Sequence, residues 1–380
     1  MADAPREHTV LVTADDVQIE QWVEYEFSIS MVEPADTFTM SRPLTDRAWR
    51  TLRPDTEIKI FIDGACQLNG YIDDAERGSK DLVMRIEGRD KGGRLVQESI
   101  PTTSGFDGLT LVDAVTKLVK PWFPKVVTTD ARNRTVRRGK GGKAPANGEP
   151  AIFNVKGKLD EDHSGRVEPG EMRWNMIEQL CSSVSLLGWS SGDGREFIIG
   201  APNYKQEVQY LFQRSKTRGS NVEDIRERFS VRDRYAKIEA HGSGAGDDVD
   251  FGDATISKLG EAFDGPNADG TGRDFKHPKR LALTHRALAD NAEGARAAQR
   301  EMNRRNFSRR QLTIDAPLHG QLYRSSVLTL FAPNTLARVI DDEKEIDDVF
   351  LIYALTFRGS RQNGETTQIK LVPRGTVFIA

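Results

Sequence analysis

The 380-residue sequence lacks most features of a disulfide-stapled, membrane-spanning or nucleic-acid-binding protein. Its two cysteines, Cys66 and Cys181, occur in unrelated surroundings, so a disulfide framework is not expected and a reducing compartment suits the chain. No apolar run approaches the roughly 18 residues of a membrane span, and the first ten residues lack the apolar centre of a signal peptide. The net charge of -3 implies no general attraction to nucleic acid or anionic membrane. We therefore expect cytoplasmic synthesis without membrane insertion.

Signatures of catalysis are also missing. The six histidines form no HExxH set, the cysteines form no CxxC pair, and neither GxSxG nor GxGxxG occurs in a suitable context. Close carboxylate pairs are expected in any folded chain with 57 acidic residues, so they do not point to glycoside hydrolysis. The sequence thus predicts no enzyme, no catalytic residue and no organic cofactor.

One stretch, DEDHSGRVEPGE, has the spacing of a calcium-binding loop. The oxygen ligands would come from Asp160, Asp162, Ser164, Arg166 through its backbone carbonyl, Glu168 and Glu171. The segment before it, IFNVKGK, does not have the pattern of the helix that normally precedes such a loop. A second interpretation needs no ion, because Pro169 fits the first position of a helix and Glu171 would lie near its positive end. Both interpretations stay open.

Alternating apolar residues dominate the first quarter of the chain. In QWVEYEFSISM every second residue is apolar, as a strand with one buried face requires, and EIKIFI runs into the turn dipeptide Asp63-Gly64. About five strands with turns between them favour a small antiparallel barrel over residues 1–98, because closure removes exposed strand edges.

Helical spacing begins after Pro101. Residues 111–119 and 171–187 each place apolar side chains on one face, and Gly188 is predicted to cap the second helix. Between them, residues 128–148 form a basic, almost entirely polar loop, which is typically solvated rather than bound to nucleic acid. We expect residues 99–225 to form a mixed α/β middle domain.

The rest of the chain returns to strands. A second barrel is predicted from residues 226–245 and 308–380, interrupted by an acidic loop and a helical insertion over residues 246–307. Its clearest hairpin is closed by Asn363-Gly364. An arginine-rich run over residues 286–310 and the acidic run DDEKEIDD are most often solvated faces, but they could also pair between subunits. The predicted fold class is therefore α+β, mainly β, with two small antiparallel barrels.

The order of these elements resembles the baseplate hub proteins of contractile-tailed phages. The segments FIDGACQLNGYIDD, IEGRDKGGRLVQESI, VEPGEMRWNMIEQLCSSVSLLGW and the final hairpin ending KLVPRGTVF carry the likeness to the Mu-like hub, which is similar in fold to the base of VgrG-type spikes. The sequence departs from the resemblance in its long basic loop and at Asn334, where a glycine is expected near a strand turn.

The resemblance implies a structural virion protein of the tail baseplate, assembled in the host cytoplasm. It implies a homotrimer whose six barrels adapt the sixfold tail tube to a threefold central spike, with DNA passing through the lumen without sequence-specific binding. Its partners would be the tail tube protein, the central spike protein and peripheral baseplate proteins. The alternatives are a tail-associated cell-wall-degrading enzyme and a calcium-dependent binding module.

Overall fold

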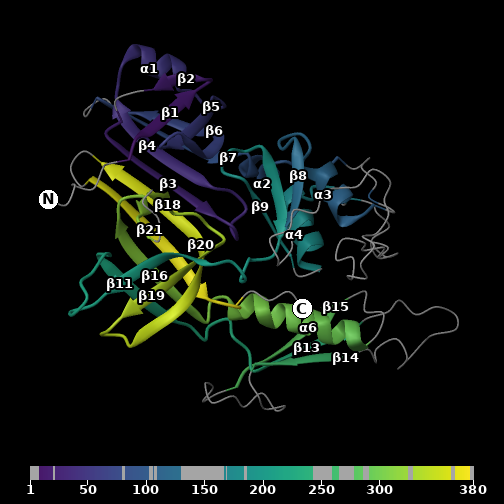
Figure 1. Cartoon of the computed structure of the whole chain (residues 1–380). Helices are drawn as coiled ribbons and strands as arrows, with labels where there is room; N and C mark the ends of the chain where they lie inside the picture. Colours follow the sequence, from purple (N-terminus) through teal and green to yellow (C-terminus); the bar gives the residue numbers. More distant parts are fainter. Residues whose placement is uncertain are drawn as a thin grey trace, which may run out of the picture.

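Strands dominate the computed structural model (Figure 1). Of the residues that the structure describes, strands hold 51% and helices 16%, so the predicted mainly β class is confirmed. The structure describes residues 8–19, 22–78, 82–101, 106, 109–129, 167, 169–183, 186–242, 259–264, 278–285, 291–323, 328–360 and 364–376.

The first part of the chain forms a strand unit that we call the N unit. Its strands are hydrogen-bonded in the order β3-β4-β7-β6-β5-β1-β2. The elements are β1 (Val10–Ala14), β2 (Val17–Ile19), β3 (Glu24–Ser30), β4 (Thr37–Pro43), α1 (Asp46–Thr51), β5 (Glu57–Ile62), β6 (Ala65–Arg77) and β7 (Val83–Asp90). The predicted Asp63-Gly64 turn is confirmed: Ile62 pairs with Ala65, and both turn residues have positive φ.

The last part of the chain repeats this strand order in a second unit, the C unit. Its strands are hydrogen-bonded in the order β12-β16-β21-β20-β19-β11, which matches the order β3-β4-β7-β6-β5-β1 and follows the same chain order. The match ends at the last strand, because β11 runs parallel to β19 whereas β1 runs antiparallel to β5. The strands are β11 (Val208–Arg214), β12 (Asp224–Phe229), β16 (Arg310–Pro317), β19 (Thr335–Asp341), β20 (Ile346–Ser360) and β21 (Gly364–Pro373). A short hairpin of β17 (Gly320–Gln321) and β18 (Thr329–Leu330) takes the place of α1.

The match extends to single residues. In both units the strand after the turn carries a bulge, between Ile72 and Asp74 in β6 and between Ile352 and Ala354 in β20. Just before each bulge, the carbonyl of the isoleucine accepts a hydrogen bond from a residue with positive φ. That donor is Asp55 in the N unit, at 2.8 Å, and Asn334 in the C unit, at 2.9 Å. Asparagine tolerates this backbone conformation, so Asn334 fills the role for which a glycine was expected.

The two units are joined by strand pairing. Beyond its bulge, β20 pairs with β21 on one side and with β3 on the other, so both units share one 13-stranded sheet. Two separate closed barrels were predicted; among the described residues no strand pair closes either unit. One face of the sheet packs a continuous apolar core, in which Phe27 and Phe357 stack at 4.9 Å across the joint between the units.

Between the two units in the sequence comes a mixed α/β unit with its own core, which lies beside the N unit in Figure 1. It contains α2 (Gly92–Gln97), α3 (Leu111–Val119), β8 (Lys125–Thr129), α4 (Arg173–Ser183), β9 (Leu187–Ser190) and β10 (Glu196–Gly200). The predicted helix over residues 111–119 is confirmed, with Thr110 as its N-cap. Cys181 is a buried core residue of α4, as expected. The predicted middle domain extended to residue 225, whereas β11 and β12 belong to the large sheet.

Two predicted helix boundaries are wrong. Gly188 does not cap α4 but lies in β9, where a Cβ atom would meet the Phe197 ring at 3.0 Å. Pro169 is not at the first helical position, because it lies in a turn with Gly170 and α4 begins only at Arg173. The positive φ of Gly170 bends the chain before the helix starts.

A small α/β unit separates β12 from β16. It contains β13 (Lys237–Gly242), β14 (Leu259–Phe263), β15 (Arg280–His285) and α6 (Asn291–Asn306), and α6 packs on the sheet through Ala298 and Met302 (Figure 1). The prediction placed residues 226–245 in the second barrel, but β13 pairs only with β14 and β15 among the described strands. The period-two pattern identified a strand correctly and could not specify its sheet.

Candidate functional site: the polar face of the large sheet

The face of the large sheet opposite the core is lined by polar side chains from both units. Paired residues in adjacent antiparallel strands lie on the same face, so the register defines this polar face row by row. One row runs Thr366, Arg358, Glu26, Thr39, Glu87 and Asp74; the next runs Asp315, Gln368, Thr356, Ser28, Thr37 and Arg89. A third contains Ser360, Glu24, Ser41, Arg85 and Glu76.

Four arginines on the polar face lie against carboxylates. The arginine-carboxylate contacts are Arg358–Glu26 at 2.7 Å, Arg85–Glu87 at 2.8 Å, Arg89–Asp73 at 2.7 Å and Arg226–Asp315 at 2.8 Å. These pairs are partly exposed, so each adds little to stability, but each also cancels a positive charge that would otherwise attract phosphates. The result is a hydrophilic surface without a dense positive field.

The Gly-Arg-Asp segment in IEGRDKGG has a structural role. A Cβ atom on Gly88 would lie 2.1 Å from the Tyr71 carbonyl, so only glycine fits there. Asp90 is buried; its carboxylate accepts hydrogen bonds from the Asp36 amide at 3.1 Å and from the Ser190 hydroxyl of β9. Burial raises the pKa of Asp90 to about 6 although its hydrogen bonds act to lower it, and burial together with the nearby Asp90 raises the pKa of Asp36.

A second buried polar cluster lies where the N and C units meet. The fully buried His319 bonds Thr367 through Nδ1 at 2.9 Å and the Tyr25 hydroxyl through Nε2 at 2.8 Å. Because the Thr367 hydroxyl donates to the Leu318 carbonyl at 2.7 Å, it accepts from Nδ1–H. Burial lowers the pKa of His319 to about 3. Since the lowered pKa keeps the imidazole neutral, Nε2 then accepts from the Tyr25 hydroxyl. The cluster fastens the units together.

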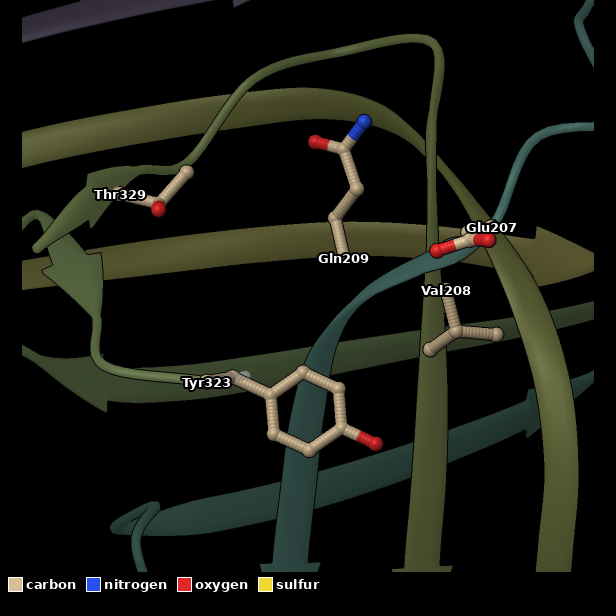
Figure 2. Close-up of a pocket in the computed structure, with 5 residues that line it drawn as sticks. All are labelled: Glu207, Val208, Gln209, Tyr323 and Thr329. Atoms are coloured by element: carbon tan, nitrogen blue, oxygen red, sulfur yellow. The ribbon is translucent and has the colours of Figure 1, made fainter. Parts of the chain in front are cut away.

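A shallow pocket of about 320 Å³ lies where β11 passes the β17–β18 hairpin (Figure 2). It is lined by Glu207, Val208, Gln209, Tyr323 and Thr329. Its described lining includes one carboxylate, Glu207, and two hydroxyl groups, but no histidine or cysteine. The pocket gives no support to an enzymatic reaction.

The predicted calcium loop falls mainly outside the described residues. Asp160, Asp162, Ser164, Arg166 and Glu168 lie there, as does most of the basic loop over residues 128–148. Glu171 is described, and its backbone carbonyl accepts a hydrogen bond from the Ile100 amide at 2.8 Å. Among the described residues no group of three or more histidine, cysteine or acidic side chains could hold a metal ion. The calcium interpretation stays a prediction.

Members of the two predicted charge runs pair within the chain. On α6, Glu301 contacts Arg304 at 2.8 Å and Arg305 at 2.6 Å, while Asp347 of the acidic run pairs with Arg338 at 2.8 Å. Glu343 contacts Lys216 at 3.0 Å. These contacts favour the solvated-face interpretation over pairing between subunits. No helix in the described part of the chain is long and apolar enough to cross a membrane.

Similarity to known proteins reaches from end to end of the chain. Residues 310–375, which contain β16 to β21, match the family described as tail protein, C-terminal domain (NMB1110-like). The structure of the tail protein from Neisseria meningitidis MC58 superposes with a TM-score of 0.74 at 21% identity, covering 98% of each chain. The chain has the fold of a phage-type tail protein. The 43 kDa tail protein of prophage MuSo2 from Shewanella oneidensis gives a TM-score of 0.71 at 18% identity, covering 98% of this chain and 100% of that one.

The tail-protein fold extends to a secretion-system component. The E. coli c3393 protein, described as a component of the type VI secretion system with structural similarity to T4 tail proteins gp27 and gp5, gives a TM-score of 0.54 at 10% identity. The alignment covers 97% of this chain and 78% of the c3393 chain. No curated protein sequence matches the chain. The likeness to Mu-like tail proteins and secretion spikes, expected from the sequence, is thus confirmed.

The sequence did not reveal the continuous polar face, and it indicated the repeat only as two strand-rich units, one at each end of the chain. The alternation in β3, β4 and β7 predicts one polar face for each strand, but only the register shows that these faces are continuous from the N unit into the C unit. The sequence carries only a weak sign of the repeat: Asp55 comes shortly before the β5–β6 hairpin and Asn334 directly before the β19–β20 hairpin, and both residue types tolerate positive φ. The core side chains differ too much between the units for the sequence alone to reveal it.

Proposed function

We propose that this protein is a structural hub of a phage-type tail or tail-derived injection machine. Three copies form a ring of six strand units that adapts a sixfold tube to a threefold spike. The observation that carries this proposal is the repeat: one chain holds two units of identical strand order, so three chains supply six similar units. The similarity to tail proteins over the whole chain agrees with it.

The polar face is the proposed wall of the conduit. A DNA channel must be hydrophilic, yet a dense positive wall would bind the phosphates and hold the DNA. Arg358, Arg89 and Arg226 each lie against a carboxylate, so the face meets both requirements. Passage of DNA without sequence-specific binding is therefore proposed, with the tube, spike and peripheral baseplate proteins as partners. The proposed location is the tail baseplate of the virion, after assembly in the host cytoplasm.

The role is proposed to be non-enzymatic. The buried carboxylates Asp36 and Asp90 are occupied by structural hydrogen bonds, and so is the buried His319. Incubation with purified peptidoglycan should release no soluble fragments. Release of fragments would overturn this part of the proposal and favour a cell-wall-degrading enzyme.

The first test is the absolute mass in solution. Light scattering after size exclusion, at two concentrations and moderate salt, should give a species near three times the 42.4 kDa chain mass. The mass is measured first for the chain alone and then after addition of the purified spike or tube protein. A chain that stays monomeric under both conditions contradicts the ring.

A further inference from the structure

Two strand edges of the monomer are open where their counterparts in the repeat are paired. Beyond its bulge, β6 pairs with β7 on one side, and no described strand pairs with its other side from Asp74 to Arg77. The matching segment of β20, Ala354 to Ser360, carries β21 on one side and β3 on the other. The N unit therefore has an empty position where the C unit holds a strand.

The strand that matches β3 is also open on one side. It is β12, which pairs with β16 but, within the described part of the chain, with no strand on its outer side. The Ile225 amide is bonded to the carboxylate of Asp224 at 2.9 Å, as fits an edge amide outside a ladder. Phe229, at the end of β12, is 69% exposed, and the nearby Val231 is 56% exposed. Apolar side chains exposed beside an open strand edge favour pairing with another strand.

We propose that β12 of one copy pairs antiparallel with the open edge of β6 in a second copy, as β3 pairs with β20 within each chain. The inference rests on the proposed ring and names the surface that holds it together. A head-to-tail contact of this kind generates a closed ring when the rotation closes. Each chain then contributes one internal joint and one joint between copies, and six similar joints alternate around the ring.

The repeat also fixes the register of the joint between copies. The bulges align Asp74 with Ala354, and pairing through β4, β7, β16 and β21 aligns β12 with β3. Within the chain, Leu355, Thr356 and Phe357 lie opposite Ile29, Ser28 and Phe27. The equivalent pairs between copies are Ala75 opposite Phe229, Glu76 opposite Arg228 and Arg77 opposite Glu227.

These pairs are chemically complementary, although the alignment used only backbone pairing. Glu76 and Arg228 are both exposed in the monomer and would form an opposite-charge pair on the polar face. Arg77 and Glu227 would lie opposite each other on the other face, where Glu227 already contacts Arg310 at 2.7 Å and Arg77 stacks on Trp49 at 4.8 Å, so this second pair of opposite charge would add to existing contacts. Phe229 would cover Ala75, which packs at the margin of the N-unit core, and would lose its exposure to water. An alignment without biological meaning has no reason to match charge and apolar character at three successive positions.

Cysteine cross-linking tests the register. The double variant Ala75→Cys/Phe229→Cys should form disulfide-linked dimers and trimers on mild oxidation, because directly opposed residues bring their Cβ atoms within bonding reach. The matched control is Glu76→Cys/Phe229→Cys, whose side chains would point to opposite faces and should stay unlinked. The unaltered chain controls for half-buried Cys66 and buried Cys181. Light scattering is measured on every variant.

The outcomes distinguish failure of the proposed strand pairing from failure of the proposed trimeric ring. Linked trimers in the first variant alone support the proposed pairing. Trimers by light scattering without the cross-link overturn the pairing while the ring stands, whereas monomers under all conditions overturn both.

Charge reversal provides a second, independent readout. Glu76→Arg should weaken trimer formation by about tenfold or less, as expected for a partly exposed pair, and Glu76→Arg/Arg228→Glu should restore it. Equal thermal unfolding of the monomeric forms shows that the substitutions do not act through folding. Failure of the double variant to recover any assembly, with folding intact, overturns the predicted pair.

Discussion

The N and C units share a strand order but fill their cores differently. At matching positions of the β4–β7 and β16–β21 pairs, the N unit has Phe38 opposite Gly88, whereas the C unit has Leu312 opposite Leu371. The N unit thus pairs a large side chain with a glycine at the position where the C unit pairs two leucines. Close packing constrains the total volume at such a pair rather than each residue, so the backbone pattern persists while the sequence changes.

The joints differ in the same way. Within the chain the joint between units is apolar at its centre, where Phe27 stacks on Phe357 with both side chains fully buried. The matching positions of the proposed joint between copies are Glu227 and Arg77. A permanent internal joint is buried as soon as the chain folds, whereas an edge that waits for a second copy must remain compatible with water.

Substitution at the internal joint is expected to have the largest effect. Phe357→Ala should lower the free energy of unfolding by about 3–5 kcal/mol, because it removes a fully buried ring and leaves a cavity. The matching variant, Arg77→Ala, should change monomer stability by less than about 1 kcal/mol, since its side chain is exposed. Urea unfolding of both monomers measures the contrast, and similar losses would contradict the division into internal and external joints.

The exchange of core volumes can be tested next. Gly88→Ala should destabilise the protein by about 1–3 kcal/mol, because its Cβ would meet both the Tyr71 carbonyl and the Phe38 ring, at 2.1 and 2.6 Å. Adding Phe38→Leu removes only the clash with the ring. Partial recovery in the double variant is therefore expected; full recovery would show that the backbone contact is unimportant.

Two buried clusters should respond to pH in opposite directions. The folded-state pKa of His319 is lowered to about 3, so the unfolded chain binds more protons below about pH 6.5 and stability from this group is lost as pH falls. Besides Tyr25, which is hydrogen-bonded to it, His8 and Asp63 are the ionisable side chains that act on His319. Relative to His319→Gln, the normal chain should lose about 1.4 kcal/mol per pH unit between pH 6.5 and 4.5 in denaturant titrations.

The Asp36–Asp90 pair should have the opposite slope. The folded-state pKa values of both carboxyls are raised, so the folded chain binds more protons and stability from this pair is lost as pH rises through about 6. Asp36→Asn keeps an acceptor for the Ser30 amide, which Asp36 binds at 2.8 Å, and removes one charge. Relative to this variant, the normal chain should therefore gain stability from pH 7 to 5. A flat difference between the two proteins would contradict the raised pKa values.

Much of this architecture could be predicted from local signals. The alternation in β3 and β5, the Asp63-Gly64 turn and the spacing in α3 each reflect a preference that a few neighbouring residues satisfy. Sheet membership could not be predicted in the same way, because the partner of a strand such as β13 lies far along the chain and edge and interior strands share one pattern. Gly188 misled for a related reason: its role is set by the Phe197 ring rather than by the end of a helix.

The smallest effect is expected on the polar face. Glu26→Gln removes the ion pair with Arg358. The side chain of Glu26 is 52% exposed and that of Arg358 is 43% exposed, so the free energy of unfolding should fall by less than about 1 kcal/mol. The variant nevertheless leaves Arg358 as an uncompensated cation on the proposed conduit wall. Binding of duplex DNA by the assembled protein should then rise measurably at low salt and disappear at high salt. Matched loss of Arg358 in Arg358→Gln should not raise binding. If both variants bind duplex DNA as the normal chain does, a change of charge on this row of side chains has no effect on DNA binding. The proposal that charge pairing keeps the conduit wall from holding DNA would then be wrong.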